Sequence, residues 1–201
     1  EHALDKLRLA GVGKAVVNVH YLPAQVEAYL AKHAQDLAIT ISDERELLME
    51  TGGGLVQALP LIDADPFYCV NSDAIWTDGE VDGLTRLAQD WDGARMDGLL
   101  LLVPVARAFN HNGKGDFSLD AEGRPVRRGD AASAPFVYTG IQLLSRAFLH
   151  DAPSGPFSTN ILWDRAIAKG RLFGLEHHGD WFDIGSPQAI APTEAALRAN
   201  A

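Results

Sequence analysis

Strand-like and helix-like segments alternate along the first half of this sequence, and this alternation limits the folds it can adopt. Residues rich in β-branched and apolar side chains, typical of strands, occupy 15–19, 37–41, 66–70 and 99–105. Helical apolar spacing occupies 3–10, 23–30, 55–62 and 84–88. Strand–helix–strand units of this length predict right-handed crossovers between parallel strands, with helices on both faces of the sheet. We therefore expect an α/β, Rossmann-like fold with a mixed, mainly parallel sheet.

The second half of the sequence has a more antiparallel character. Residues 117–119 and 124–127 flank a glycine-containing turn, a pattern typical of a hairpin. A strand at 136–141, a helix at 159–169, strands at 172–175 and 181–185, and a final helix begun by Ser186 and Pro187 follow. We expect a single domain, 1–201, in which a nucleotide-type half, 1–105, and a smaller antiparallel half, 106–201, surround one cleft.

The composition argues against two classes of partner. The 201 residues are 47% hydrophobic and 22% charged, as in a globular protein long enough to bury a substantial core. The formal net charge of −10 disfavours nucleic acid and anionic membrane surfaces, so any bound phosphate must be held locally. Cys69 is the single cysteine, which excludes an internal disulfide. With no apolar run of membrane-spanning length and no signal-peptide pattern, the sequence predicts a cytoplasmic protein.

Two aspartates stand at the ends of predicted strands. Asp73 follows an apolar run within segment 70–73, and Asp183 ends the strand in segment 181–185. Ligands of α/β proteins lie at the carboxyl ends of the strands, so we expect these carboxylates to converge at one sheet edge and to hold a divalent cation against a phosphate. For Asp73 alone, a helix N-cap or an Asx turn is the other interpretation.

Mg²⁺ suits such a pair because it prefers oxygen ligands and commonly takes one or two carboxylates. Zn²⁺ would require histidine or cysteine ligands, and the sequence contains no such cluster. His177 and His178 are adjacent, so in a strand their side chains point to opposite faces. We expect both at the surface or at the edge of the cleft.

Three glycine-containing segments are further candidates for ligand contact. The triplet at 52–54, ahead of a predicted helix, either lets the backbone approach a planar ligand or forms a flexible connection. Asp116 ends a polar loop, where it accepts hydrogen bonds from sugar hydroxyls or, as composition favours, caps a turn. Gly140 interrupts a strand, which marks either a β-bulge or a ligand lying against the backbone. The residues alone leave these alternatives open.

Taken in order, these segments resemble the sugar-1-phosphate nucleotidyltransferase family over nearly the whole chain. Enzymes of this family make a nucleotide sugar and pyrophosphate from a nucleoside triphosphate and a sugar 1-phosphate. The resemblance rests on the glycine-rich segment 50–54, the strand-end segment 70–73, the strand 138–141 and the Trp-x-Asp-x-Gly motif at 181–185. It implies three groups of site residues: catalytic and Mg²⁺-binding Asp73 and Asp183; nucleotide-binding Glu50, Thr51, Gly52, Gly53 and Asn71; and sugar-phosphate-binding Gly115, Asp116, Thr139 and Gly140.

Among the branches of this family, the sequence looks most like the N-acetylmuramate-1-phosphate uridylyltransferases. The Glu-Thr-Gly-Gly-Gly form of segment 50–54, the segment 115–117 and the short C-terminus carry this likeness. It implies UTP and N-acetylmuramate 1-phosphate as substrates, UDP-N-acetylmuramate as product and a role in peptidoglycan recycling. Mannose-1-phosphate guanylyltransferases and glucose-1-phosphate thymidylyltransferases are sister branches that remain open. The residues do not give the oligomeric state.

Two departures from the family pattern carry expectations of their own. Ser72 stands where the family usually has glycine, which adds a hydroxymethyl group close to the nucleotide. The family also opens with a strand, a glycine-rich loop containing an arginine, and a Lys-Pro pair, which hold the triphosphate, whereas this sequence starts with the helix that follows. Because that strand is central in such a sheet, we expect a strand-wide gap between the strands around Val17 and Val70, and a chain that is not self-sufficient as an enzyme.

Two other classes of protein compete with this interpretation. A nucleotide-sugar-dependent glycosyltransferase would use segment 71–73 as a degenerate Asp-x-Asp metal motif, but it has no use for the glycine triplet and Asp183. A non-catalytic nucleotide-sugar-binding domain would tolerate a missing triphosphate loop, but it has less use for two metal-binding aspartates. In the favoured class, catalysis comes from positioning two anions and neutralising phosphoryl charge, without a protein nucleophile.

Overall fold

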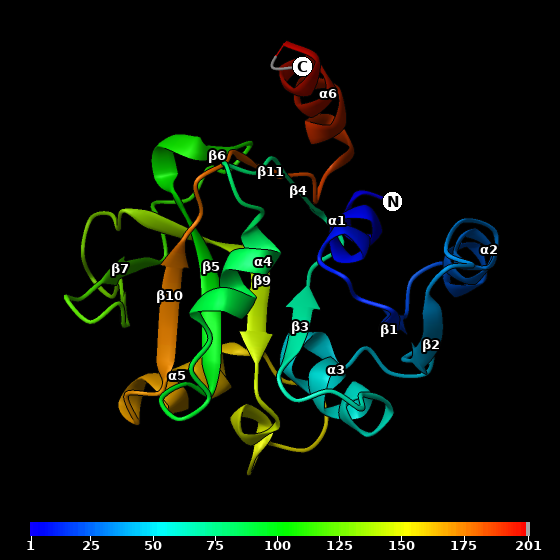
Figure 1. Ribbon diagram of the computed structural model, residues 1–201, viewed down its shortest axis with the longest axis horizontal. Helices are drawn as coiled ribbons and strands as arrows, with labels where there is room; N and C mark the ends of the chain where they lie inside the picture. The colour runs from blue at the N-terminus through cyan, green and yellow to red at the C-terminus, as the bar shows by residue number, and fades with distance from the viewer. Residues whose placement is uncertain (200–201) are drawn as a thin grey trace.

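The computed structural model describes residues 1–199, in which helices flank three separate β-sheets (Figure 1). The helices are α1 (His2–Leu9), α2 (Pro23–His33), α3 (Glu50–Ala58), α4 (Gly83–Asp90), α5 (Asn160–Ala168) and α6 (Ile190–Ala199). The strands are β1 (Lys14–Val19), β2 (Ala38–Asp43), β3 (Phe67–Val70), β4 (Ala74–Trp76), β5 (Gly98–Pro104), β6 (Ala108–Phe109), β7 (Phe117–Leu119), β8 (Pro125–Arg127), β9 (Phe136–Leu144), β10 (Leu172–Glu176) and β11 (Trp181–Asp183). No helix in this part of the chain is long and apolar enough to cross a membrane.

The largest sheet is built around β5 and β9. β5 pairs in parallel with β10 and antiparallel with β9, and the far edge of β9 pairs with β3 and β7. Alternate residues of β5 enter different cores: Leu99 and Leu101 pack with α4, whereas Leu100 and Leu102 pack with α5. The sheet is therefore buried on both faces, and the predicted mixed α/β fold with flanking helices is confirmed.

A small sheet of β4, β11 and β6 lies next to this core. β11 pairs antiparallel with β4 and parallel with β6. In the ladder with β4, Asp183 lies opposite Ala74, the residue directly after Asp73. This pairing brings together two strand ends that are far apart in the sequence.

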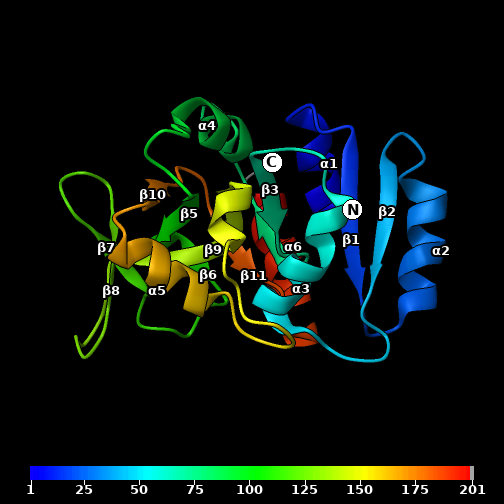
Figure 2. The same cartoon turned by 90° about the horizontal axis from the view of Figure 1, so that it is seen from below.

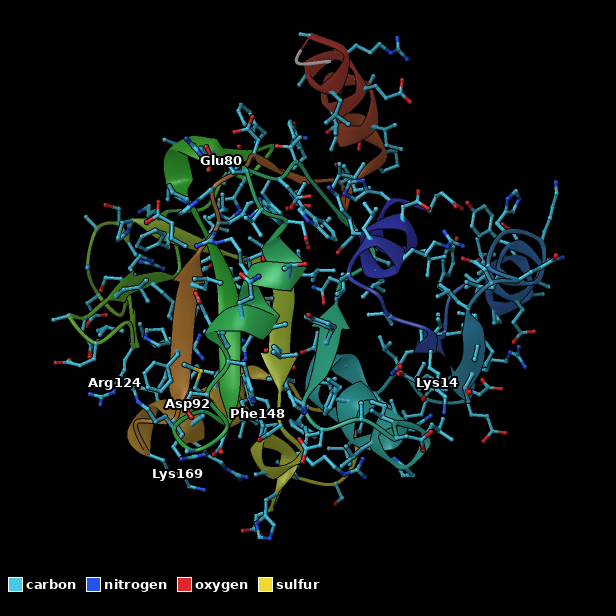
Figure 3. The ribbon with its side chains drawn as sticks, viewed as in Figure 1. Lys14, Glu80, Asp92, Arg124, Phe148 and Lys169 are labelled. Carbon is cyan, nitrogen blue, oxygen red and sulfur yellow. The ribbon has the colours of Figure 1, made fainter. Side chains whose placement is uncertain are left out.

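Strands β1 and β2 form a parallel pair that no other strand of residues 1–199 joins. Figures 1 and 2 place this pair and α2 at one end of the molecule, outside the large sheet. Lys14, which begins β1, lies on the side of the molecule opposite Arg124 (Figure 3). The nearest strand of the large sheet in both views, β3, pairs only with β9 within the described chain. The predicted gap between the strands around Val17 and Val70 is confirmed.

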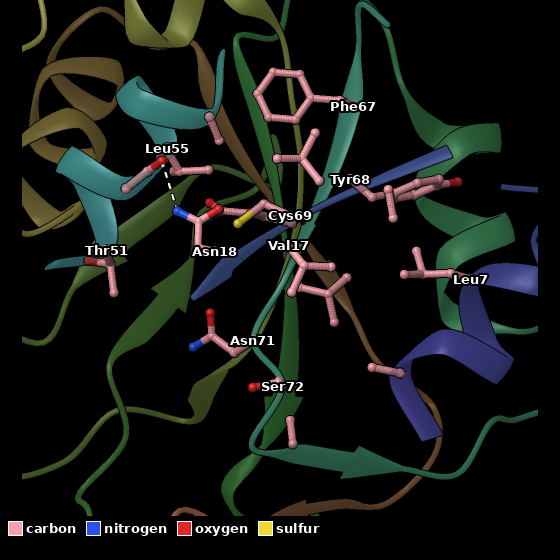
Figure 4. A pocket seen from close by; sticks show the side chains of 18 of the residues that line it. Leu7, Val17, Asn18, Thr51, Leu55, Phe67, Tyr68, Cys69, Asn71 and Ser72 are labelled. Atoms are coloured by element: carbon pink, nitrogen blue, oxygen red, sulfur yellow. Dashed lines mark hydrogen bonds between the residues drawn. The ribbon is translucent and has the colours of Figure 1, made fainter. Parts of the chain in front are cut away.

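A cavity of about 2040 Å³ occupies this gap (Figure 4). Apolar side chains of β1 and β3 line its centre, among them Val17, Phe67 and Cys69. Polar side chains from β1, from α3 and from the segment after β3 also line it: Asn18, Thr51, Asn71 and Ser72. The cavity therefore combines an apolar gap between two strands with a polar region at strand and helix ends.

The structure corrects the prediction for one of the adjacent histidines. His178 is exposed as predicted, but His177 is only 1% exposed. The His177 backbone N–H donates to Leu102 O (2.7 Å), and its Nε2 lies 2.9 Å from Thr77 O. The prediction fails for His177 because these contacts, made by residues distant in sequence, hold it in the interior between β5 and the segment after β4. The alternation of side chains correctly separates the two histidines.

Burial gives His177 a testable effect on stability. Desolvation lowers the pKa of His177 below its ordinary value, and the hydrogen bond to Thr77 O opposes this shift only in part. Nδ1 is buried with no partner in the described chain, so a proton there would be uncompensated. As pH falls below about 6.5, the unfolded chain binds this proton before the folded protein does, so the free energy of unfolding decreases.

We expect the thermal midpoint to fall between about pH 7.5 and pH 5.5, a range that spans the ordinary histidine pKa. In His177→Gln, whose amide can still donate to Thr77 O, this decrease should be smaller. His178→Gln is the matched control and should keep the decrease of the unsubstituted protein. If the thermal midpoint of His177→Gln fell with pH as steeply as that of the unsubstituted protein, His177 would not be the source of the pH dependence.

Candidate active site

The two aspartates predicted to be catalytic lie together where β4 and β11 meet. Ile184 N donates to Asp73 O (2.9 Å), and Gly185 N donates to Asp183 Oδ1 (2.9 Å). A methyl group built on Gly185 would lie 3.1 Å from Asp183 Oδ1 and 3.5 Å from Asp73 Oδ2. Both residues line a second cavity, of about 220 Å³. The geometry thus brings together the two strand ends that the sequence singles out.

The donor set at this point fits Mg²⁺. Asp73 is exposed and Asp183 is half-buried, so both carboxylates are accessible to a ligand. Residues 1–199 contain no group of three or more His, Cys, Asp or Glu side chains arranged to hold a metal ion. Mg²⁺ needs no such cage, because water and substrate phosphates complete its shell. Binding of Mg²⁺ by Asp73 and Asp183 stays a prediction.

The sheet beside the aspartates contains a β-bulge at Gly140. The pairing of β9 with β5 shifts between Leu100 and Leu102, and Gly140 has a φ of +81°. Asn71 N donates to Gly140 O (2.8 Å), and a Gly140 methyl group would lie 2.9 Å from Asn71 Cβ. Of the two interpretations that the sequence leaves open, the bulge is therefore correct, and glycine is needed for both the φ angle and the approach of Asn71.

Thr139 stabilises this bulge from inside the sheet. Its buried hydroxyl donates to Leu101 O (2.8 Å) and accepts from Ile141 N (3.3 Å). Its carbonyl accepts a hydrogen bond from Trp181 Nε1 (2.8 Å). Thr139 and Gly140 both line the cavity of the aspartates. Because the hydroxyl is already hydrogen-bonded, any sugar contact by Thr139 would involve its backbone.

Asp116 lies where the two cavities meet, since it lines both of them. Its Oδ2 accepts from Tyr138 N (2.9 Å), which is the capping role that composition favours. Its Oδ1 has no hydrogen-bond partner within residues 1–199 and remains available to a sugar hydroxyl. Gly115 lines neither cavity. Its φ is +80°, and a methyl group built on it would lie 2.1 Å from Ala134 O, so only glycine fits here. Gly115 therefore positions the neighbouring Asp116.

The structure also corrects the prediction for the glycine triplet, which lies within helix α3 rather than ahead of a helix. Gly52 N and Gly53 N both donate to Phe157 O (2.8 and 3.2 Å). A methyl group on Gly52 would lie 2.3 Å from the Phe157 ring. Glycine's low helix propensity is overridden because the helix packs closely against residues 155–157. Gly52 and Gly53 line neither cavity.

The other residues predicted to bind nucleotide do reach the large cavity. Glu50, Thr51 and Asn71 all line it. Glu50 begins α3 with a φ of +58°, and Thr51 Oγ1 accepts a hydrogen bond from Thr159 N (3.0 Å). The start of α3 and the end of β3 therefore both contribute polar groups to this cavity, which leads to the aspartates.

Comparisons with known proteins agree with this geometry. No family model matches the chain. The N-acetylmuramate alpha-1-phosphate uridylyltransferase of Caulobacter vibrioides is 42% identical over 201 residues, which cover 98% of this chain and 83% of the relative. The protein of the same name from Neisseria meningitidis serogroup B is 31% identical over 203 residues, covering 96% and 81%. The chain belongs to the N-acetylmuramate α-1-phosphate uridylyltransferase family.

Solved structures of lower identity support the fold of this family. A UDP-glucose pyrophosphorylase complexed with UDP-glucose superimposes with a TM-score of 0.77 at 12% identity, over 100% of this chain and 86% of that structure. The family resemblance drawn from the segments 50–54, 70–73, 138–141 and 181–185 is thus confirmed, although the first of these is a helix in the structure.

Glu44 and Asn18 form a polar pair at the start of α3, which the sequence does not predict. Glu44 is 6% exposed; its Oε1 accepts from Asn18 Nδ2 (2.5 Å) and its Oε2 accepts from Met49 N (3.0 Å). Asn18 Nδ2 also donates to Gly54 O (3.0 Å, Figure 4). The pair therefore ties β1 to the helix N-terminus that lines the cavity. The available signal is the polar Asn18 within a run of valines.

Tyr138 stands in the segment 138–141, which the sequence singles out without predicting a role for this side chain. Its ring contacts Trp163 edge to face, with 4.6 Å between ring centres, and it lines both cavities. Burial, and secondarily the nearby Cys69, raises the pKa of Tyr138 well above its usual range. The hydroxyl therefore stays protonated at neutral pH and can donate a hydrogen bond to a ligand.

Proposed function

We propose that this protein transfers a uridylyl group from UTP to N-acetylmuramate 1-phosphate, forming UDP-N-acetylmuramate and pyrophosphate. The pair of carboxylates Asp73 and Asp183, in a cavity that shares Asn71, Asp116 and Tyr138 with the larger one, is the observation that carries the proposal. The 42% identity to a relative of that name supports the choice of substrates. The proposal includes Mg²⁺ as the metal and a role in peptidoglycan recycling in the cytoplasm.

The reaction requires positioning rather than a protein nucleophile. An oxygen of the sugar phosphate attacks the α-phosphorus of UTP, a new P–O bond forms in line, and the bond to pyrophosphate breaks. Bound Mg²⁺ would neutralise charge on the phosphoryl oxygens. Asp73 and Asp183 would hold that ion, since a methyl group built on Gly185 lies within 3.5 Å of both carboxylates, whereas Asp116, which lines the same cavity, accepts a hydrogen bond from Tyr138 N.

Other residues would hold the two substrates on either side of the reacting phosphates. Glu50, Thr51 and Asn71 line the side on which we place the nucleotide. On the sugar side, Asp116 Oδ1 would accept from a sugar hydroxyl, and Tyr138 would donate. The bulge at Gly140 lines the smaller cavity, so the sugar would lie beside it.

A substrate panel scored by pyrophosphate release tests this function. For the protein as its natural gene encodes it, we expect kcat/KM for UTP with N-acetylmuramate 1-phosphate to exceed that of other pairs by roughly 100-fold or more, the discrimination available to a site that hydrogen-bonds its substrate. Preference for GTP with mannose 1-phosphate, or for dTTP with glucose 1-phosphate, would assign a sister function. Glycosyl transfer from a labelled nucleotide sugar, without pyrophosphate release, would overturn the reaction class.

A further inference from the structure

Arg127 differs from the other basic residues in its relation to the candidate site. Among the described residues, Lys14 and Arg127 are the lysine and arginine side chains that line the two cavities. Lys14 is 75% exposed, begins β1 and pairs with Asp63 (3.0 Å). Arg127 therefore supplies the permanent positive charge at the other side of the large cavity, where the hairpin of β7 and β8 meets α5.

The surrounding residues hold the Arg127 guanidinium in one orientation. Its Cζ lies 5.0 Å from the centre of the Phe117 ring and 5.4 Å from that of Trp163. Nε donates to Asp164 Oδ1 (2.9 Å), and Nη1 donates to Asn160 Oδ1 (2.8 Å). Nη2 lies 2.8 Å from Asp164 Oδ1 and donates to Asn160 O (3.3 Å). The second hydrogen of Nη1 has no acceptor in the described part of the chain, and the side chain is 33% exposed. A fixed guanidinium with an unused donor is suited to bind an anion.

Arg127 lies next to the sugar side of the candidate site. In the ladder of β7 and β8 it pairs with Phe117, the residue after Asp116. Thr159 lines the same cavity, is 4% exposed and makes no hydrogen bond through its hydroxyl within residues 1–199. The cavity lining therefore continues from Asp73 and Asp183, past Asp116, to an arginine and a hydroxyl that both have unused donors.

N-acetylmuramate presents a group that suits these donors. It differs from N-acetylglucosamine by a lactyl ether on the 3-oxygen, which ends in a carboxylate. In a protein of net charge −10, and beside the carboxylate of Asp116, this extra anion would be repelled unless a cation faced it. Arginine suits a carboxylate because its charge is permanent and its hydrogen bonds to an anion are charge-assisted, and the unused hydrogen of Arg127 Nη1 could make one such bond.

We propose that Arg127 is the specificity-determining residue that binds the lactyl carboxylate of N-acetylmuramate 1-phosphate, with the Thr159 hydroxyl as a second donor. This inference rests on the proposed function and assigns a residue to its sugar specificity. Asn160, Asp164 and the ring of Trp163 act by holding the guanidinium in place, so that little conformational entropy is lost on binding.

The test compares two sugar phosphates in the protein as its natural gene encodes it. For Arg127→Gln, we expect kcat/KM with N-acetylmuramate 1-phosphate to fall by about 10- to 100-fold, mainly through KM, the range for a lost hydrogen bond to a charged group. The affinity for N-acetylglucosamine 1-phosphate, measured as substrate or competing inhibitor, should change by less than about threefold, since it lacks the carboxylate. For Arg127→Lys, which keeps the charge, kcat/KM with N-acetylmuramate 1-phosphate should lie between the values for Arg127→Gln and for the unsubstituted protein.

Two further variants separate recognition from structural damage. Arg124→Gln is the matched control, because Arg124 belongs to the same hairpin but lines neither cavity (Figure 3). Asp164→Asn keeps a side-chain oxygen that can accept from Arg127 Nε but removes the negative charge that competes with the ligand, so binding of N-acetylmuramate 1-phosphate should be kept or improved. The proposal would be overturned if Arg127→Gln weakened the use of both sugar phosphates equally. It would also be overturned if Asp164→Asn lowered kcat/KM with N-acetylmuramate 1-phosphate as much as Arg127→Gln does. Failure of the unsubstituted protein to use N-acetylmuramate 1-phosphate would instead overturn the proposed function.

Discussion

In the protein as its natural gene encodes it, replacing Asp73 or Asp183 by asparagine is expected to lower turnover by at least about 100-fold while the protein stays folded. Each substitution removes a negative charge from the pair that lines the smaller cavity. Metal stabilisation of phosphoryl charge is worth several kcal/mol, and each loss of about 1.4 kcal/mol costs a factor of ten in rate. The measurement is the rate of pyrophosphate release as a function of Mg²⁺ concentration.

The fold should survive because neither carboxylate is required for packing. Asp73 is exposed, and an asparagine at 183 can still accept the hydrogen bond from Gly185 N. Asp130→Asn is the matched control, since Asp130 is exposed and lines neither cavity. Thermal midpoints within a few degrees of the unsubstituted protein would exclude unfolding as the cause. Near-normal Mg²⁺-dependent turnover in either aspartate variant would show that the metal assignment is wrong.

Much of the fold can be predicted from the sequence because its main strands have strong local patterns. The apolar run 99–103 predicts β5, and the valines of 15–19 predict β1. The strand β6 cannot be predicted in this way, because its two residues show no periodicity. The antiparallel place of β9 between β5 and β3 depends on tertiary pairing that no single segment encodes.

The candidate site is predictable only in part, for a related reason. Asp73 and Asp183 stand at strand ends, and strand ends meet at one sheet edge, so their convergence follows from position in the sequence. Arg127 and Glu44 have no such signal, because their roles depend on partners from other elements, such as Trp163 for Arg127. The division into halves at residue 105 and the binding roles of the individual residues stay predictions.

The two failed predictions have a common physical cause. The glycine triplet has low helix propensity and His177 is polar, so local reasoning places one in a loop and the other at the surface. In the structure, residues 155–157 approach α3 too closely for any side chain at Gly52. Leu102 O accepts from the backbone N–H of His177, and Thr77 O lies 2.9 Å from its Nε2, in the interior. In both cases long-range contacts override the local preference.

A polypeptide of residues 1–201 alone is expected to unfold below about 45 °C, the lower limit of ordinary mesophilic domains, and to show no measurable turnover. The reason is the cavity of about 2040 Å³ between β1 and β3, which is lined by apolar side chains that are only half-buried, such as Val17 and Val70. Each unsatisfied buried backbone group costs about 1 to 3 kcal/mol, against a total stability of about 5 to 15 kcal/mol for a domain. An extended segment placed between the two strands would pair with both edges and cover these side chains.

Hydrogen exchange locates the expected weakness in this polypeptide. Amides of β1 and β2 should exchange at least about 100-fold faster than those of β5, since this pair is joined to the large sheet across a cavity, whereas β5 is buried between two cores. β5 is the internal control, because its protection reports global unfolding. Equal protection of β1 and β5, together with turnover of UTP by residues 1–201 alone, would show that the gap has no energetic consequence.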